Sequence, residues 1–195
     1  MKELRAPDTE LPADALRRFA ARAGEEGLLD VAYAKLDTPV GEVLAAATPR
    51  GVVRISYTDW FAPDATLEDL ARRVSPRVVE APARLDELRR ELDEYFEGER
   101  KRFDIRIDRA LLGPFARKVL GRTARVPYGK VSTYGEVAAA AGSPRASRAA
   151  GNALASNPIP IVIPCHRVLR SGGGMGGYTG GLERKTALLE LEGAL

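Results

Sequence analysis

The chain has 195 residues, of which 45% are apolar and 29% are charged, a composition typical of a soluble globular protein. It contains one cysteine and one histidine, which excludes a disulfide within the chain and a four-ligand structural zinc site. It has neither a signal-peptide pattern nor the roughly 18 consecutive apolar residues of a membrane span, so we expect a cytoplasmic protein.

Charge is distributed unevenly along the chain. Residues 1–110 carry 19 basic and 23 acidic side chains, whereas residues 111–195 carry 11 basic and 4 acidic ones. The stretch 117–170 is the most biased, with nine Lys or Arg and a single acid, Glu136. This excess suggests a polyanionic partner such as nucleic acid, although a solvated basic face would give the same count.

The first 110 residues predict a small α+β unit. Apolar positions follow the helical period in some stretches and the alternation of strands in others, with turns rich in Pro and Gly between the strands. The expected elements are an amphipathic helix over 13–23, three strands between Val31 and Tyr57 with turns at 39–41 and 49–51, helices over 64–74 and 83–97, and a strand over 103–107.

A boundary is expected at Gly113-Pro114, beyond which the pattern is mainly helical. Apolar residues at helical spacing predict one helix shortly after this boundary and another at the end of the chain. The residues expected in their cores are Phe115, Val119 and Leu120 in the first helix, and Leu182, Leu188, Leu189 and Leu191 in the second.

Two short helices are predicted between these. Thr133 and Glu136 have the spacing of a capping box, which opens a helix over 133–141. Ser143 and Pro144 suit the cap and the first position of a second helix, which runs to about residue 156. Such a pair is typical of a helix-turn-helix, although an ordinary helix pair has the same spacing.

The most informative segment is NPIPIVIPCHRV at 157–168, where three prolines interrupt a short apolar strand. Proline fixes φ and removes a donor, so this segment is expected to be rigid. It leads to the only thiol, Cys165, and the only imidazole, His166. A thiolate near a base is a strong nucleophile, whereas the alternative for a lone cysteine is a buried apolar side chain. Neighbours on a strand point to opposite faces, so contact between the two side chains requires a turn or a bridging water.

Glycines dominate the stretch 171–181 that follows. Gly172, Gly174 and Gly177 match the dinucleotide-binding pattern GxGxxG, but no helix opens inside it and too little chain follows for a βαβ unit. We therefore predict a mobile loop whose backbone can approach a ligand. Glu190 and Glu192, near the end of the last helix, could orient an imidazole, although solvent exposure is the default for such carboxylates.

Together these motifs resemble the O6-alkylguanine-DNA alkyltransferases, also called methylated-DNA–protein-cysteine methyltransferases. The resemblance is strong over residues 113–193, whereas residues 30–110 are compatible with that family's variable N-terminal domain without a specific motif. The segments that carry it are VPYGKVSTYGEVA at 126–138, GSPRASRAAG at 142–151, NPIPIVIPCHRV at 157–168, which includes the PCHRV motif at 164–168, and GYTGGLERK at 177–185.

The resemblance implies direct-reversal repair of DNA in a single turnover. A cysteine thiolate takes the alkyl group from guanine O6, possibly also from O4-alkylthymine as a secondary substrate, and the protein is spent. On this resemblance, Cys165 is the acceptor, His166 is a base that acts through a water, and Glu192 orients His166. Asn157 braces the site, and Tyr134 hydrogen-bonds guanine N3 and helps to neutralise the leaving guanine.

The resemblance also implies contacts to the substrate base and to DNA. The target atom is stacked inside a duplex, so the base must be flipped out, and Tyr178, Thr179, Val168 and Met175 are expected around it. Arg148 is expected to fill the gap left in the stack, on a helix whose other side chains are small enough to approach the minor groove. The residues expected at DNA are Arg148, Arg145, Ala146, Ser147, Gly151, Tyr134 and Thr133.

The predicted fold class is α+β, with a small N-terminal α/β domain that has a short antiparallel sheet and a mainly helical C-terminal domain that contains a helix-turn-helix. The expected boundaries are an extension over 1–28, the α+β domain over 29–110, and a DNA-binding and alkyl-transfer domain over 111–195. The expected partner is double-stranded DNA containing O6-alkylguanine, bound in its minor groove by a monomer without cofactor, metal or membrane.

Three other functions stay open on the sequence. The first is a non-catalytic alkylated-base binder that recruits other repair factors; such relatives replace the cysteine, so Cys165 argues against it. The second is a helix-turn-helix regulator, which usually presents longer polar side chains to the major groove. The third is a Cys-His hydrolase, which would turn over repeatedly.

Overall fold

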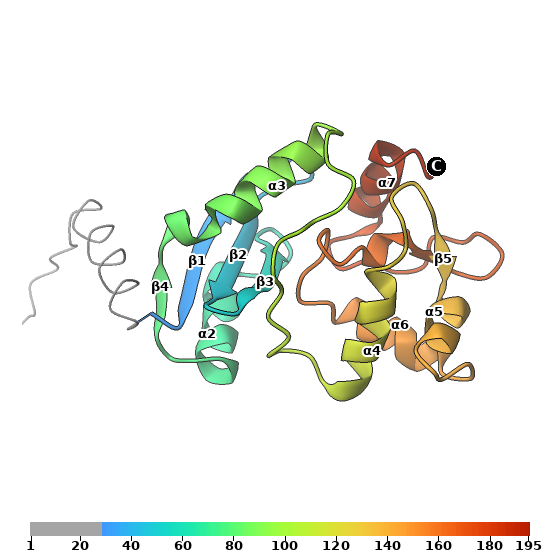
Figure 1. The fold of residues 1–195 in the computed structure, drawn as a ribbon, viewed down its shortest axis with the longest axis horizontal. Coiled ribbons are helices and arrows are strands. Elements are labelled where there is room, and N and C mark those ends of the chain that lie inside the picture. Colours follow the sequence, from blue (N-terminus) through green and yellow to red (C-terminus); the bar gives the residue numbers. More distant parts are fainter. Residues whose placement is uncertain (1–28) are drawn as a thin grey trace, which may run out of the picture.

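The structure is a computed structural model that describes residues 29–195. The helix predicted over 13–23 and the extension over 1–28 lie outside this range. The described chain folds as a small sheet domain followed by a mainly helical domain, and Figure 1 shows the two side by side. The predicted α+β class is confirmed. Within the described range, no helix is long and apolar enough to cross a membrane.

The N-terminal sheet has three strands in a meander and a short fourth strand. β1 (Val31–Leu36), β2 (Val43–Thr48) and β3 (Gly51–Tyr57) pair antiparallel, as predicted. β4 (Val78–Glu80) pairs parallel to β1, so the sheet is mixed rather than wholly antiparallel, with the order β3-β2-β1-β4. Three residues are too few to show an alternation, so the sequence pattern does not reveal β4.

Helices cover both faces of this sheet, close to their predicted bounds. α2 (Pro63–Arg73) packs Leu70 against the face that carries Val31 and Val53. α3 (Asp86–Phe96), preceded by the 3-10 turn η1 (Pro82–Leu85), packs its apolar stripe against the other face. The hydrophobic core on the α3 side of the sheet continues into the C-terminal domain. This shared core joins the two halves of the chain.

The strand predicted over 103–107 is wrong. Only Ile107 forms a bridge, with Val52 of β3. The backbone N–H groups of Asp104 and Ile105 instead donate to the Glu91 carboxylate, at 2.9 Å and 3.3 Å. These donors are therefore used by a side chain of α3 and cannot enter a sheet.

The C-terminal domain surrounds two very short strands with helices. β5 and β6 pair in parallel, which places the start of α5 beside the chain that follows η2. The elements are α4 (Pro114–Thr123), β5 (Ser132–Thr133), α5 (Tyr134–Ala140), α6 (Ser147–Ala155), η2 (Cys165–Arg167), β6 (Val168–Leu169) and α7 (Leu182–Leu191).

The predicted helix pair is present as α5 and α6. The capping box is confirmed: Glu136 N donates to Thr133 Oγ1, and Thr133 N donates to Glu136 Oε2. The predicted start of the second helix is wrong, because α6 begins at Ser147 with Ala146 as its N-cap. Ser143 instead closes a turn by accepting from Ala146 N at 2.9 Å, so the connection is longer than a Gly-Ser-Pro turn.

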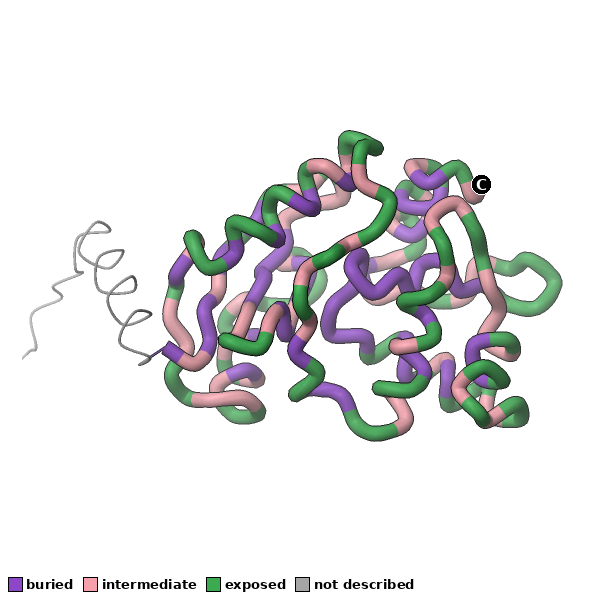
Figure 2. The backbone as a smooth tube through the Cα atoms, in the orientation of Figure 1, coloured by how far each residue is buried: buried purple, intermediate pink, exposed green. Residues whose placement is uncertain are grey.

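Two consecutive segments of the C-terminal domain differ sharply in how far they are buried. An unbroken run of buried residues extends from 157 to 169 and is purple in Figure 2, whereas the glycine-rich loop after it is mostly exposed. In α7, Leu188 and Leu189 are buried as predicted, but Leu182 is 52% exposed and does not belong to the core. The first turn of α7 therefore lies at the surface.

Candidate functional site

Tight turns, not the predicted strand, precede the thiol. Val162 N donates to Pro160 O at 2.9 Å and Cys165 N donates to Ile163 O at 2.8 Å, so two γ-turns follow in succession. Ile161, in the centre of the first, has φ +72°, a strained conformation for a β-branched residue. The strand prediction is wrong because the prolines that interrupt the segment leave too few donors for a ladder.

Cys165 opens the 3-10 turn η2, and only 5% of it is exposed. Asn157 Nδ2 donates to Cys165 Sγ at 3.2 Å and to Ile163 O at 2.9 Å, while Asn157 Oδ1 accepts from Ile159 N. Burial raises the pKa of the thiol to about 11, although the Asn157 hydrogen bond acts in the opposite direction. The resting thiol is therefore neutral and held in one place.

His166 is fully buried beside the end of α7. Its Nε2 lies 2.9 Å from Glu192 Oε1, and an ionised carboxylate only accepts, so Nε2 carries the ring proton. Its Nδ1 is buried and has no hydrogen-bond partner within residues 29–195. Burial lowers the pKa of His166. The ring is therefore neutral and presents one unpaired basic nitrogen.

Glu192 is buried and ionised, contrary to the default expectation of exposure. Arg167 Nε and Nη2 each donate to its carboxylate at 2.8 Å, and the Tyr95 hydroxyl donates at 2.7 Å. Burial would raise the pKa of Glu192, but the hydrogen bonds from His166 and Arg167 lower it to about 2. Tyr95 comes from α3, so the N-terminal domain completes this network.

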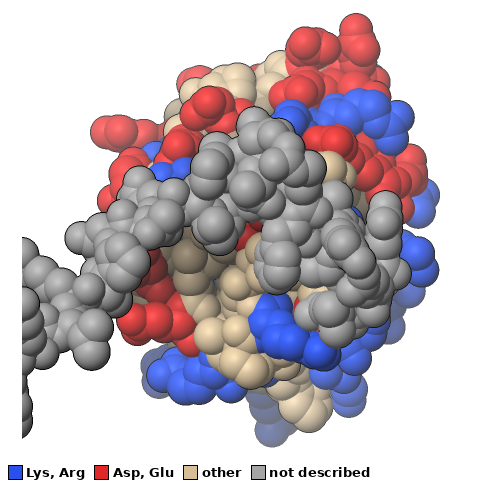
Figure 3. All heavy atoms as spheres, turned by 90° about the vertical axis from the view of Figure 1, so that its left-hand side faces the viewer, with Lys and Arg blue, Asp and Glu red and all other residues tan. Residues whose placement is uncertain are grey.

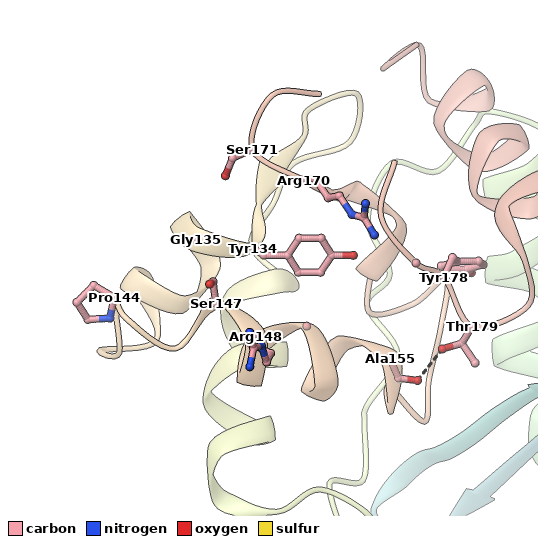
Figure 4. Close-up of a pocket in the computed structure, with 12 residues that line it drawn as sticks. Tyr134, Gly135, Pro144, Ser147, Arg148, Ala155, Arg170, Ser171, Tyr178 and Thr179 are labelled. Carbon is pink, nitrogen blue, oxygen red and sulfur yellow. Dashed lines mark hydrogen bonds between the residues drawn. The ribbon is translucent and has the colours of Figure 1, made fainter. Parts of the chain in front are cut away.

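A cavity of about 750 Å³ opens between the start of α5, one side of α6 and the glycine-rich loop. In Figure 4 the Tyr134 ring points across it toward the segment that carries Tyr178 and Thr179. Gly176 packs so closely on this ring that an added Cβ would lie 2.4 Å from the Tyr134 hydroxyl. The predicted site residues that line the cavity are Tyr134, Ser147, Arg148, Gly151, Tyr178 and Thr179.

Of the residues predicted to surround the substrate base or to accept its alkyl group, three do not line this cavity. Val168 is fully buried in β6, and Met175 contributes its backbone carbonyl to another contact. Cys165 is also absent from the lining, but Tyr178 packs against the core cluster that contains Cys165, and the ring centroids of Tyr178 and His166 are 6.3 Å apart. Among the described residues, no three His, Cys, Asp or Glu side chains gather in a group that could hold a metal ion.

Lys185 fixes the glycine-rich loop and was not predicted. Its ammonium group is buried and donates to the carbonyls of Val168, Met175 and Gly177, the first at 2.6 Å. Burial lowers the pKa of Lys185 to about 8. Lys185 precedes Leu188 by three residues, so it lies on the buried face of α7, and this spacing is the signal in the sequence that could have revealed it.

The N-terminal domain also holds this loop. The hydroxyls of Tyr57, at the end of β3, and Tyr178 lie 3.0 Å apart. The guanidinium of Arg184 lies 4.4 Å above the Tyr57 ring and donates to Val40 O and to Asp59. No motif predicts these contacts, because they join segments more than a hundred residues apart.

Family models account for both domains of the described structure. One described as "6-O-methylguanine DNA methyltransferase, DNA binding domain" matches residues 114–194. Another described as "6-O-methylguanine DNA methyltransferase, ribonuclease-like domain" matches residues 31–109. The chain belongs to the 6-O-methylguanine DNA methyltransferase family.

Individual members of this family are similar over most of the chain. The constitutive methylated-DNA–protein-cysteine methyltransferase of Bacillus subtilis is 36% identical over 82% of this chain and 94% of its own. A methylated-DNA–protein-cysteine methyltransferase of Methanosarcina acetivorans is 38% identical over 83% and 98%. The crystal structure of Mycobacterium tuberculosis OGT in complex with DNA has a TM-score of 0.72 at 33% identity, over 84% of this chain and 93% of that one.

In this member of the 6-O-methylguanine DNA methyltransferase family, the residues predicted to contact DNA gather around the helix pair. Arg148, Ser147 and Gly151 lie on α6 and line the cavity. Arg145 is exposed in the turn that leads to α6. Thr133 is occupied as the N-cap of α5, so its hydroxyl already has a donor within the protein. Three of the residues predicted to contact DNA therefore meet at the cavity: Ser147, Arg148 and Gly151.

Proposed function

We propose that this protein is a methylated-DNA–protein-cysteine methyltransferase that moves the alkyl group from guanine O6 in DNA to Cys165, once per molecule. The observation that carries the proposal is a single buried thiol next in the chain to an imidazole whose Nε2 is held by Glu192 and whose Nδ1 has no hydrogen-bond partner within residues 29–195. Family membership supports the same reaction.

The proton moves first. The Cys165 thiol is protonated at rest because its pKa is about 11. Its proton passes through a water to His166 Nδ1, and the resulting imidazolium is stabilised by Glu192. Asn157 Nδ2 donates to the sulfur, and a donor of this kind favours the thiolate.

The alkyl group is then transferred in line. A bond forms between Cys165 Sγ and the alkyl carbon while the bond from that carbon to O6 breaks. The electron pair of the broken bond goes to the guanine, which leaves as an anion. Tyr134, on the cavity wall, hydrogen-bonds guanine N3 and helps to neutralise this charge. The thioether has no leaving group that water displaces readily, so the protein is consumed.

The substrate base reaches the site by leaving the duplex. The partner is double-stranded DNA approached from the minor groove by a monomer, with the small residues of α6 against the groove and Arg148 in the vacated stack. Tyr178 and Thr179, which line the cavity, wall the base. Val168 and Met175, as parts of that wall, remain a prediction.

The reaction fits a protein without cofactor or metal, because the thiol itself is the acceptor. A thiol that must stay reduced also fits a reducing compartment such as the cytoplasm. Duplexes that carry larger alkyl groups at guanine O6, or a methyl group at thymine O4, measure which alkylated bases the site accepts.

The test is stoichiometric transfer of label. A duplex with one O6-methylguanine, labelled in the methyl group, should pass one equivalent of label to the protein. The mass of the peptide containing Cys165 should rise by one CH2, because a methyl group replaces the thiol hydrogen. Cys165→Ala should bind the duplex and accept no label. Label on another residue, or label left on DNA, contradicts the proposal.

The same experiment separates the other functions considered. A non-catalytic binder of alkylated bases would bind the duplex without taking label, and the names of the relatives do not favour it. A hydrolase would release label over many turnovers. A helix-turn-helix regulator would prefer one undamaged sequence over others, whereas a repair protein should not.

A further inference from the structure

Five basic side chains surround a second hollow, away from the cavity described above. It has a volume of about 670 Å³ and lies between α4 and the C-terminal end of α5, and we name it the basic groove. Its basic lining residues are Arg109, Arg117, Lys118, Arg122 and Arg125. All five are exposed, no acidic residue lines the groove, and none of the five forms an ion pair within residues 29–195.

The basic groove is shaped before any ligand arrives. Arg117 Nε donates to Leu112 O at 2.8 Å and its Nη2 donates to Arg109 O at 3.1 Å, so this guanidinium is fixed by the backbone. Gly121, in the last turn of α4, has no atom within 4 Å of the place a Cβ would take. Glycine inside a helix lowers the stability of the helix by about 1 kcal/mol relative to alanine. At this position it leaves the groove free of a side chain.

The basic groove and the cavity lined by Tyr134 lie at opposite ends of α5. The start of α5 lines that cavity with Tyr134 and Gly135, and the end of α5 lines the basic groove with Ala140 and Ala141. Seven residues of helix span roughly 10 Å, which is about three base-pair steps of a duplex. DNA whose damaged base occupies the cavity therefore brings phosphates of one flank within reach of the groove.

We propose that the basic groove binds the phosphodiester backbone of the duplex on one side of the damaged base. This inference rests on the proposed function and extends it, because it assigns a second contact with DNA outside α6 and the cavity. Five cations that have no ion-pair partner in the described part of the chain create a positive potential, and a polyanion matches such a potential along its length. Contacts to phosphate carry no base identity, which suits a protein that must work in any sequence.

The acidic charge of the N-terminal domain supports a duplex whose flank runs over the basic groove and away from that domain. Figure 3 shows acidic side chains over the upper part of the face that carries the sheet, and basic ones along its lower edge. α3 contributes exposed acids to the N-terminal domain, among them Asp86, Glu87 and Asp93. These carboxylates would repel the phosphates of a duplex that continued over α3. The flank of the duplex is therefore expected to contact the C-terminal domain.

The first test compares two double variants of equal charge. Lys118→Gln/Arg122→Gln removes two cations of the groove, and Arg84→Gln/Arg102→Gln removes two exposed cations of the N-terminal domain. Binding to a long duplex is measured with Cys165→Ala in every protein, so that no transfer occurs. The groove variant should lower the slope of log affinity against log salt by about two units, whereas the control should leave it unchanged.

The second test locates the flank. In the same background, the damaged base is placed two base pairs from the 5′ end of a short duplex or two base pairs from its 3′ end. Compared with the protein whose groove is unchanged, the groove variant should bind one of these duplexes several-fold more weakly. The two proteins should bind the other duplex with equal affinity. Gly121→Glu, which places a carboxylate in the groove, should act in the same direction, while Gly121→Ala should not.

Three results overturn the inference: an unchanged salt slope in the groove variant, an equal loss in its control, or equal losses on the two truncated duplexes. Failure of the proposed function is recognised separately. With Cys165 intact and the O6-methylguanine duplex at saturating concentration, the groove variant should take up one methyl group as fast as the unchanged protein. Absence of this transfer in both proteins would contradict the proposed function alone.

Discussion

His166 and Glu192 form a buried pair in which Nε2 lies 2.9 Å from Oε1, while the other ring nitrogen has no hydrogen-bond partner among residues 29–195. Because Glu192 stays ionised, the ring proton is fixed on Nε2 and the basic lone pair on Nδ1. The carboxylate thus determines which side of the imidazole can accept the thiol proton. The same pair links the reaction to the stability of the fold, since Arg167 shares the carboxylate.

Glu192→Gln should lower stability and remove an acid transition. The folded-state pKa of about 2 lies below the ordinary value of 4.5, so the carboxylate stabilises the fold above about pH 4.5, and this is lost as pH falls toward 2. At pH 7 the variant leaves Arg167 with an uncompensated buried charge, which costs about 3–5 kcal/mol. Urea unfolding between pH 2 and 7 measures both effects, and Glu190→Gln, at an exposed position, is the control. A pH dependence shared by both variants contradicts the assignment.

Asn157→Ala should slow the chemical step. It removes the donor to Cys165 Sγ, so the thiol is harder to ionise, and loss of a hydrogen bond to a charged group costs about 1.5–3 kcal/mol, or roughly ten- to a hundredfold in rate. Single-turnover transfer from the free nucleoside measures this step without DNA binding. Asn152→Ala, at an exposed position of α6, should transfer at the original rate. A variant as fast as the original protein would leave Asn157 with a structural role only.

How far the sequence predicts this site depends on how local the contacts are. Cys165, His166 and Asn157 stand in one short motif, so the resemblance identifies them, and the structure brings them together with Glu192. Tyr95 escapes prediction because it reaches the site from α3, nearly a hundred residues away in the sequence. The same holds for the helix caps: the capping box of α5 is a local pattern and is confirmed, whereas the start of α6 depends on a turn that the pattern did not reveal.

Lys185→Met should loosen the glycine-rich loop. Methionine fills a similar volume but leaves the carbonyls of Val168, Met175 and Gly177 without their donor, so the free energy of unfolding should fall by about 1–3 kcal/mol. Amide hydrogen exchange should rise over residues 170–178 and stay unchanged in α4. Lys130→Met, at an exposed position, is the matched control. Unchanged exchange in the loop would show that other contacts hold it.

Tyr57→Phe tests whether the N-terminal domain positions the substrate loop. The variant keeps the ring under Arg184 and removes only the hydroxyl that lies 3.0 Å from Tyr178. A neutral hydrogen bond contributes about 0.5–1.5 kcal/mol, so overall stability should change little. Exchange near Tyr178 should rise and transfer should slow several-fold. Tyr33→Phe, in β1, should do neither, and an equal effect of both variants would indicate a general loss of stability.

Arg148→Ala should affect duplexes and spare single strands. Arg148 lines the cavity mouth on α6, where it can replace the flipped base in the stack. Unstacking and unpairing a base costs a few kcal/mol, so loss of the side chain that fills the gap should slow transfer from a duplex roughly tenfold or more. A single strand has no stack to restore, and its transfer rate should stay the same. Arg145→Ala, which removes an exposed cation beside α6, should weaken binding at low protein concentration without changing the rate at saturation. If Arg148→Ala slows single strands and duplexes equally, Arg148 acts in the chemistry or in binding, and not in base flipping.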